Sequence, residues 1–356
     1  MNIKKFIAGF AFSVLLLISC SRDNDPAPTA PNTEKDAVND FVWKAMNSWY
    51  YWQPKVPKLA DSFNNSAEYV SFINSKTPDG LFYSLLYDYG NTDRFSWIEN
   101  KNTIVTASRI AEVEKSSGFD YAVYPKDNTN TSAVALVNYV VPGSPAANAG
   151  IKRGDIITKV NGMPLTISNY SQLSQDQFTV TRAATAVMTS TALVTTDSVE
   201  NISITKVDID ENPVAFYKKY NYSGKNIGYL VYNGFKSDYN DELNAAFATM
   251  KADGITELVL DLRYNGGGSL ETASALAQMI NGNFTGQPYV YLDFNDKHNN
   301  EDGMEYLSNT VRTYNIMNGH PEQIGQQQVN SLNLNRIYVL VSFQTASASE
   351  LTVISL

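Results

Sequence analysis

The chain has 356 residues, of which 43% are hydrophobic and 18% are charged, an ordinary composition for globular domains. This length allows two or three domains. The formal net charge of -9 and the absence of any lysine- or arginine-rich run argue against a nucleic-acid-binding protein with a broad basic surface.

The N-terminal segment is typical of an exported protein. Two lysines precede residues 6–18, which are almost wholly apolar. That run is shorter than the roughly 20 residues that cross a bilayer. The next residues, LISC, resemble a bacterial lipobox, and Cys20 is the only cysteine, which excludes an internal disulfide. The sequence predicts a signal peptide over 1–19, a lipid anchor at Cys20 that attaches the protein to a membrane of the bacterial cell envelope, and a Pro-rich tether over 20–36. A plain secretory signal is the alternative.

Residues 37–110 are expected to form a small helical domain. Apolar residues recur at helical spacing from Ala37 to Trp52, and two prolines follow. Residues 67–73 and 80–87 are predicted to be further short helices. The many aromatic residues of this region favour simple core packing.

Residues 111–206 change to a pattern of strands and turns. Strand-forming residues dominate 121–125 and 134–141. A Pro-Gly-Ser-Pro turn at 142–145 then leads to a short helix that ends at Gly150. The pattern alone predicts a small β-rich module with one short helix.

The segment from Val140 to Gly162 resembles a PDZ domain of the bacterial protease-associated kind. The matching motifs are Gly-Ser-Pro-Ala at 143–146, Gly-Asp-Ile-Ile at 154–157 and Val-Asn-Gly at 160–162. PDZ domains bind a peptide C-terminus as an added strand and hold its carboxylate with backbone N–H groups. The loop that would bind the carboxylate consists of Ser117, Gly118, Phe119 and Asp120. Because an inward-facing aspartate would repel an anion, a PDZ fold that acts only as a spacer or regulator is the alternative.

Strands and helices alternate over residues 207–356. Strands are predicted at 226–235, 257–262 and 336–342, and helices at 239–250, 270–280 and 346–356. This alternation predicts an α/β layer with a mainly parallel sheet, in which the apolar runs at 257–262 and 336–342 are buried strands.

A triple glycine, Gly266–Gly268, connects a predicted strand to a predicted helix. Glycines tolerate positive φ, and a helix start offers free N–H groups, so this junction suits an anion. The lysine of a phosphate-binding loop is missing, since Ser269 and Leu270 follow, and the spacing does not fit a dinucleotide-binding turn. A tight structural turn is the alternative.

Ser347 has the same setting, at a helix start directly after a strand. Its hydroxyl would be exposed beside free N–H groups, as in a nucleophile elbow, and Ala346 and Ala348 leave room for a substrate. The alternative is that Thr345 or Ser347 is a plain N-cap, because Ser347 and Glu350 fit the capping-box spacing.

The base that would activate this serine is not evident. The two histidines, His298 and His320, lie in polar loop-like segments and are expected at the surface, which disfavours a Ser-His-Asp triad. A lysine could serve if desolvation lowered its pKa from about 10.4 to about 7–8.

Together these motifs resemble the C-terminal processing (tail-specific) peptidases, which are Ser–Lys endopeptidases with a crotonase-like α/β core. The resemblance extends from about Ala37 onward, and DRFSWI at 93–98 matches the helical N-terminal part of bacteroidete-type members. It implies a multidomain α/β protein with an N-terminal helical domain (37–110), a PDZ-like β-rich domain (111–206) and a partial peptidase core (207–356). It further implies a catalytic site made of the nucleophile Ser347, the oxyanion-hole N–H groups of Gly267, Gly268 and Ala348, and the supporting Glu350.

In that family the general-base lysine lies downstream of the serine, whereas no lysine follows Ser347 here. The chain ends on an apolar helical segment without a C-cap, so we expect it to be the N-terminal part of a longer protein and expect residues 1–356 alone to be inactive. The leading hypothesis is a Ser–Lys endopeptidase, without metal or organic cofactor, that cleaves polypeptides at or near their C-terminal regions after capture by the PDZ module. The alternative is a non-catalytic surface lipoprotein that binds peptides through that module.

Overall fold

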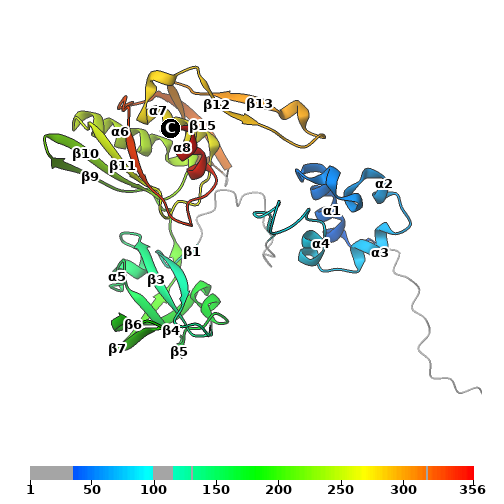
Figure 1. Ribbon diagram of the computed structural model, residues 1–356, viewed down its shortest axis with the longest axis horizontal. Helices are drawn as coiled ribbons and strands as arrows, with labels where there is room; N and C mark the ends of the chain where they lie inside the picture. Colours follow the sequence, from blue (N-terminus) through cyan, green and yellow to red (C-terminus); the bar gives the residue numbers. More distant parts are fainter. Residues whose placement is uncertain (1–34, 99–114, 130, 318–319) are drawn as a thin grey trace, which may run out of the picture. The chain divides into compact units, whose positions relative to one another are not determined.

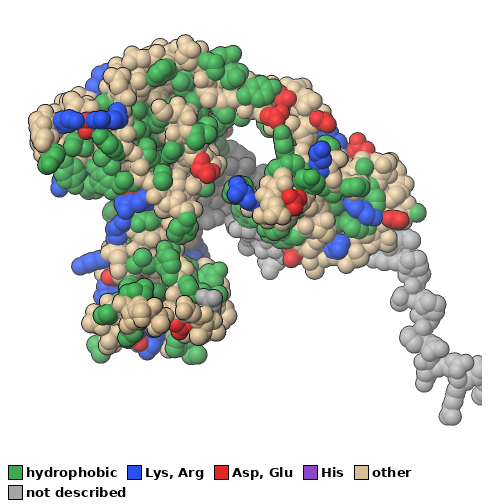
Figure 2. Space-filling view, viewed as in Figure 1, with side chains coloured by type: hydrophobic (Ala, Val, Ile, Leu, Met, Phe, Trp, Pro, Cys, Tyr) green, Lys and Arg blue, Asp and Glu red, His purple; other side chains and the backbone are tan. Residues whose placement is uncertain are grey.

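The computed structural model describes residues 35–98, 115–129, 131–317 and 320–356 (Figure 1). The predicted signal peptide, Cys20 and nearly all of the tether lie outside them. The chain divides into two compact units, and the described part of the first contains residues 35–98 together with Phe294–Asn299. Within the described residues, no helix combines the length and apolar character needed to cross a membrane. Figure 2 shows lysine and arginine side chains scattered in small groups on the visible face.

The first unit is helical, as predicted. Its helices are α1 (Ala37–Trp49), α2 (Asp61–Asn64), α3 (Tyr69–Asn74) and α4 (Pro78–Ser84), with two 3-10 turns at Gln53–Lys55 and Pro57–Leu59. Asp36 caps α1 by accepting the N–H of Asn39 at 2.8 Å. The helix ends three residues before the predicted Trp52 because prolines force the following turns out of helical geometry. The core consists of Val42, Trp43, Met46, Leu59, Tyr69, Ile73, Leu81 and Leu85.

A distant segment, Phe294–Asn299, completes this unit. The buried Asn295 side chain donates to the carbonyls of Ser48 at 2.8 Å and Tyr50 at 3.0 Å, where α1 ends. The His298 ring stacks on Trp49 with centroids 3.6 Å apart. His298 is therefore half-buried against an aromatic ring and is not the open surface residue that the sequence suggested.

The β-rich module of the second unit is a sheet in the order β2-β3-β4-β6-β7. Its strands are β2 (Phe119–Pro125), β3 (Ala133–Val140), β4 (Ile156–Val160), β6 (Gln177–Met188) and β7 (Leu193–Thr205), with β5 (Met163–Pro164) beside β4. The short helix α5 (Pro145–Asn148) ends before Gly150 as predicted, and Gly150 has a positive φ of 78°. A two-stranded ribbon, β1 (Lys115–Ser116) with β8 (Val207–Asp208), flanks the module.

The α/β core contains a four-stranded sheet in the order β16-β11-β10-β9. Its elements are β9 (Val214–Tyr222), β10 (Lys225–Tyr232), β11 (Glu257–Asp261), β16 (Ile337–Leu340), α6 (Asn240–Ala252), α7 (Leu270–Ile280) and α8 (Ala348–Ser355). The strands β10, β11 and β16 run parallel, which confirms the mainly parallel sheet. The prediction that β16 is fully buried is wrong, because this strand forms the sheet edge and exposes 46% of Tyr338 and 37% of Leu340.

Two hairpins in this core have no counterpart in the sequence analysis. They are β12 (Pro288–Leu292) with β13 (Gly303–Tyr306), and β14 (Thr310–Met317) with β15 (His320–Gln328). Both are two-stranded ribbons, so few of their side chains are buried and the alternating apolar pattern of a half-buried sheet is weak. The predicted mixed architecture, with a helical unit, a β-rich module and an α/β core, is otherwise confirmed.

Candidate functional site

The glycine turn after β11 and the serine turn after β16 lie side by side. The two strands are parallel neighbours, so their carboxyl ends meet at one edge of the sheet. A Cβ built on Gly267 would lie 2.7 Å from the Cβ of Ser347 and 2.8 Å from the carbonyl oxygen of Ala346. The carbonyl of Asn265 accepts the N–H of Ala346 at 3.3 Å and the Ser349 hydroxyl at 3.0 Å. The structure thus places Ser347 against the predicted oxyanion turn.

Ser347 has a strained backbone, with φ 54° and ψ -119°. It is exposed, while the next two residues are buried. An ordinary N-cap residue is extended, and a non-glycine residue in such a sparsely populated region costs about 1–3 kcal/mol. The N–H of Ser347 donates to Oε2 of Glu350 at 3.0 Å, so the glutamate holds the turn from the helix side. The N-cap alternative explains this hydrogen bond but not the strain, which is typical of a nucleophile elbow.

The three predicted oxyanion N–H groups are not equivalent. The N–H of Gly267 donates to Oδ1 of Asn265 at 2.9 Å. Gly268 lies opposite Phe235, which donates to the carbonyl of Gly267 and accepts the N–H of Ser269. This pattern turns the N–H of Gly268 away from Phe235. Within the described part of the chain, the N–H groups of Gly268 and of Ala348, the first residue of α8, donate to no protein acceptor and suit an anion.

The hydroxyl side chains around Ser347 fasten the serine turn to the glycine turn. Ser342 Oγ donates to the carbonyl of Arg263, and Thr345 Oγ1 donates to that of Leu262 at 2.8 Å. Ser349, which is fully buried, bonds to Asn265. Sequence analysis missed these roles because the partners lie about 80 residues away, at separations of 79, 83 and 84 positions.

An ion pair between the buried Asp261 and the partly exposed Arg263 stabilises the end of β11. Asp261 is 2% exposed and accepts the Arg263 guanidinium at 2.5 Å and the Tyr229 hydroxyl at 2.6 Å. Burial opposes ionisation of this carboxyl, but the hydrogen bonds from Arg263 and Tyr229 outweigh it and hold the pKa of Asp261 below its usual range. The carboxylate therefore stays ionised and fixes the strand end from which the glycine turn departs.

Within the described residues, no histidine or lysine forms a hydrogen bond with Ser347, whose N–H donates to Glu350 and whose carbonyl accepts the N–H of Leu351. His298 belongs to the other unit, with Nε2 at 3.1 Å from the Ser48 hydroxyl. His320 begins β15.

The predicted carboxylate loop of the PDZ-like module leads into β2, and its last two residues, Phe119 and Asp120, begin that strand, which lies at an edge of its sheet. Phe119 packs into the module core, whereas the Asp120 carboxylate accepts the Asn138 amide at 2.7 Å. Burial raises the pKa of Asp120 despite that hydrogen bond. Successive side chains of a strand point to opposite faces, so Asp120 lies on the face opposite Phe119. Peptide binding by this loop remains a prediction.

The PDZ-like module meets the α/β core near the glycine turn. The rings of Tyr139 and Tyr264 lie 5.9 Å apart, and the Arg153 guanidinium lies 5.2 Å from the Tyr264 ring.

Burial raises the pKa of the Glu211 carboxyl, which adjoins Tyr139, and the negative charge of Asp120 adds to this increase. Three groups oppose the increase: Lys236, Asn233 and Tyr139.

This shift predicts a pH dependence of stability. Because the folded state raises the pKa of Glu211, it binds the proton more tightly than the unfolded state. Glu211 therefore stabilises the folded state most at pH values below the pKa of its carboxyl in the unfolded chain, about 4.5. This stabilisation is lost as pH rises through the pKa of the same carboxyl in the folded state. The free energy of unfolding of the wild type should therefore fall between pH 4 and 8 by the amount that Glu211 contributes, and Glu211→Gln should lack this fall. The difference between the urea-unfolding free energies of variant and wild type, followed from pH 4 to 8, measures it. A pH-independent difference would contradict the prediction.

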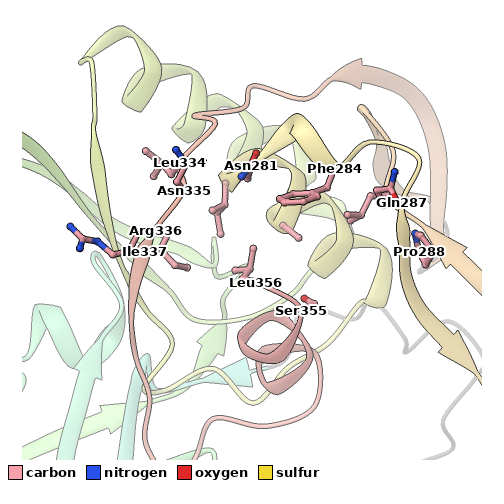
Figure 3. Close-up of a pocket in the computed structure, with 13 residues that line it drawn as sticks. Asn281, Phe284, Gln287, Pro288, Leu334, Asn335, Arg336, Ile337, Ser355 and Leu356 are labelled. Atoms are coloured by element: carbon pink, nitrogen blue, oxygen red, sulfur yellow. The ribbon is translucent and has the colours of Figure 1, made fainter.

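In the described part of the chain, cavities lie at both ends of α7. One, of about 290 Å³, lies at the C-terminal ends of α7 and α8, far along both helices from Ser347; Figure 3 shows Asn281, Phe284, Ser355 and Leu356 around it. The other, of about 510 Å³, is lined by the first two turns of α7, which begin just after Gly268, and by the two hairpins. It carries both charge signs, on Glu271, Glu305 and Arg312.

Comparisons with known proteins agree on one family. The model of peptidase family S41 matches residues 226–356, that of the peptidase S41 N-terminal domain matches 37–97, and that of the PDZ domain matches 136–180. A "Probable CtpA-like serine protease" of Staphylococcus aureus is 31% identical over 145 residues, which cover 41% of this chain and 27% of that protein. A protein of the same description from Staphylococcus epidermidis is 29% identical over 241 residues, 68% of this chain and 42% of that protein.

Among solved structures, a putative S41 protease from Bacteroides fragilis is similar with a TM-score of 0.64 and 26% identity. The similarity covers 92% of this chain and 77% of that one. Of the two staphylococcal proteins, by contrast, this chain matches only part: 27% of the length of the Staphylococcus aureus protein and 42% of that of the Staphylococcus epidermidis protein.

Proposed function

Because this chain belongs to peptidase family S41, with the family's N-terminal domain and a PDZ domain, we propose that it is a serine endopeptidase that cleaves polypeptides at or near their C-terminal regions. The observation that carries the proposal is the strained, exposed Ser347 packed against the glycine turn. A serine in this conformation presents its hydroxyl at the start of α8, where backbone N–H groups converge.

In the proposed mechanism Ser347 Oγ attacks the scissile carbonyl carbon. The N–H groups of Gly268 and Ala348 stabilise the oxyanion, and losing one such donor typically costs about 10²–10³ in rate. A lysine, expected C-terminal to Ser347, takes the Oγ proton and passes it to the leaving amine. Water then hydrolyses the acyl-enzyme and releases Ser347.

The PDZ-like module would capture the substrate tail. The edge position of β2 supports this proposal, because an edge strand can pair with an extended peptide. Binding of the terminal carboxylate predicts that a substrate with an amidated C-terminus is cleaved less efficiently than the same substrate with a free one. Equal efficiencies would argue for a spacer role of the module.

The proposal is tested with an unstructured protein substrate and three samples: the full-length gene product, its Ser347→Ala variant and residues 1–356 alone. We expect turnover only by the first, because no lysine follows Ser347 within residues 1–356. Peptide binding without turnover by the full-length product would favour the alternative, a non-catalytic peptide-binding lipoprotein.

We also propose that Cys20 carries the lipid anchor, in the cell envelope, on the basis of the LISC motif after an apolar run. Cys20→Ser is expected to move the full-length protein from the membrane fraction to the soluble fraction of an expressing bacterium, since the apolar run itself is too short to span a bilayer. Blotting of the two fractions measures this. A variant that stays in the membrane fraction would refute the anchor.

A further inference from the structure

Asn265 joins the two turns of the candidate site. It is fully buried, and its side chain makes two hydrogen bonds: Nδ2 donates to the carbonyl of Tyr232 at 2.9 Å, and Oδ1 accepts the N–H of Gly267 at 2.9 Å. Its own carbonyl accepts the N–H of Ala346 and the Ser349 hydroxyl, on either side of Ser347. One residue thus contacts the end of β10, the glycine turn and the serine turn.

These contacts have a consequence for the oxyanion site. Because Asn265 Oδ1 occupies the N–H of Gly267, that group points toward Asn265 and is not available to a substrate. Phe235 donates to the carbonyl of Gly267 and accepts the N–H of Ser269. These two hydrogen bonds fix the direction of the peptide group between Gly267 and Gly268. The carbonyl of Asn265 sets the distance between this turn and the residue before Ser347.

We propose that Asn265 is a positioning residue of the reaction: it selects the N–H of Gly268 as the glycine-side oxyanion donor and holds it in register with Ser347. This inference rests on the proposed function, in which Ser347 is the nucleophile. Such a role affects the transition state more than substrate binding, because charge develops on the carbonyl oxygen only during attack.

The test compares kcat and KM of full-length Asn265→Ala and Asn265→Ser with those of wild type. Alanine releases the N–H of Gly267, and we expect kcat to fall about 10²-fold with KM changed less than about threefold. The serine variant keeps a hydroxyl that can accept the N–H of Gly267, as in a Ser/Thr turn. We therefore expect Asn265→Ser to have a higher kcat than Asn265→Ala. Affinity for a peptide boronic acid, which forms a tetrahedral adduct on serine, is expected to fall in parallel with kcat.

Asn244→Ala is the matched control for lost stability. Asn244 is 2% exposed in α6 and also makes two side-chain bonds to distant backbone, donating to Gln328 O at 2.9 Å and accepting Asn330 N–H at 2.8 Å. We expect this variant to melt at a lower temperature and to keep wild-type kcat per folded molecule.

The outcomes separate the two claims. If Ser347→Ala keeps turnover, the proposed function fails and this inference fails with it. If Ser347→Ala is inactive but Asn265→Ala loses no more kcat per folded molecule than Asn244→Ala, only the role of Asn265 is overturned. If Asn265→Ala does not fold, the serine variant decides: a loss of kcat and boronate affinity at unchanged KM supports the role, and unchanged values for both overturn it.

Discussion

Replacing Ser347 with alanine is expected to abolish turnover by the full-length protein, with a loss on the order of 10⁶ in kcat, as for removal of other serine nucleophiles. The nucleophile begins the reaction, so neither the oxyanion N–H groups nor substrate capture can replace it. The fold should persist, because Ser347 is exposed and its backbone N–H can still donate to Glu350 in the variant. Peptide binding is therefore expected to be close to that of wild type.

The strain at Ser347 gives this prediction a second readout. Glycine adopts positive φ at little cost, so Ser347→Gly is expected to be as inactive as the alanine variant but more stable than it by about 0.5–1 kcal/mol. Ser355→Ala serves as the hydroxyl control, because this serine lies at the other end of α8 and bonds to Thr352 of its own helix. Substantial turnover by either Ser347 variant, or loss of turnover in the Ser355 control, would contradict the assignment of Ser347 as nucleophile.

The sequence was sufficient to predict the elements that carry the candidate site. Both turns follow apolar strand patterns and precede helices, and α7 has the predicted bounds, Leu270–Ile280. These signals are local, since strand, turn and helix depend on residues that are neighbours in sequence. The proximity of Gly267 to Ser347 follows from the parallel pairing of β11 with β16, which alternating strands and helices predict.

What the sequence did not predict depends on partners far along the chain. Asn265 sits within the glycine motif, yet nothing local indicates that its carbonyl bonds to Ser349, 84 positions later. The docking of Asn295 on the end of α1 is likewise a contact across 245 positions. The hairpins β12–β13 and β14–β15 bury few side chains, so only a weak burial pattern marks them.

Gly268→Ala is the second substitution expected to have a large effect. Gly268 has φ 134°, and a Cβ there would lie 2.3 Å from the carbonyl oxygen of Phe235, which cannot retreat without breaking the bond it accepts from Ser269. Backbone strain and overpacking together are expected to cost about 2–5 kcal/mol of unfolding free energy. Any shift of this peptide also displaces the proposed oxyanion donor, so the folded fraction should lose about 10²–10³ in kcat.

The neighbouring glycines provide graded controls for this effect. A Cβ on Gly266 would meet nothing within 4 Å, so Gly266→Ala is expected to change stability by less than about 0.5 kcal/mol and to keep activity. Gly267→Ala would place its Cβ 2.7 Å from that of Ser347, and is expected to impair kcat by pushing the serine turn away. Urea unfolding and turnover measurements on the three variants test whether Gly266→Ala has a much smaller effect than Gly267→Ala and Gly268→Ala. Equal kcat per folded molecule in Gly266→Ala and Gly268→Ala would show that the peptide at Gly268 does not take part in the reaction.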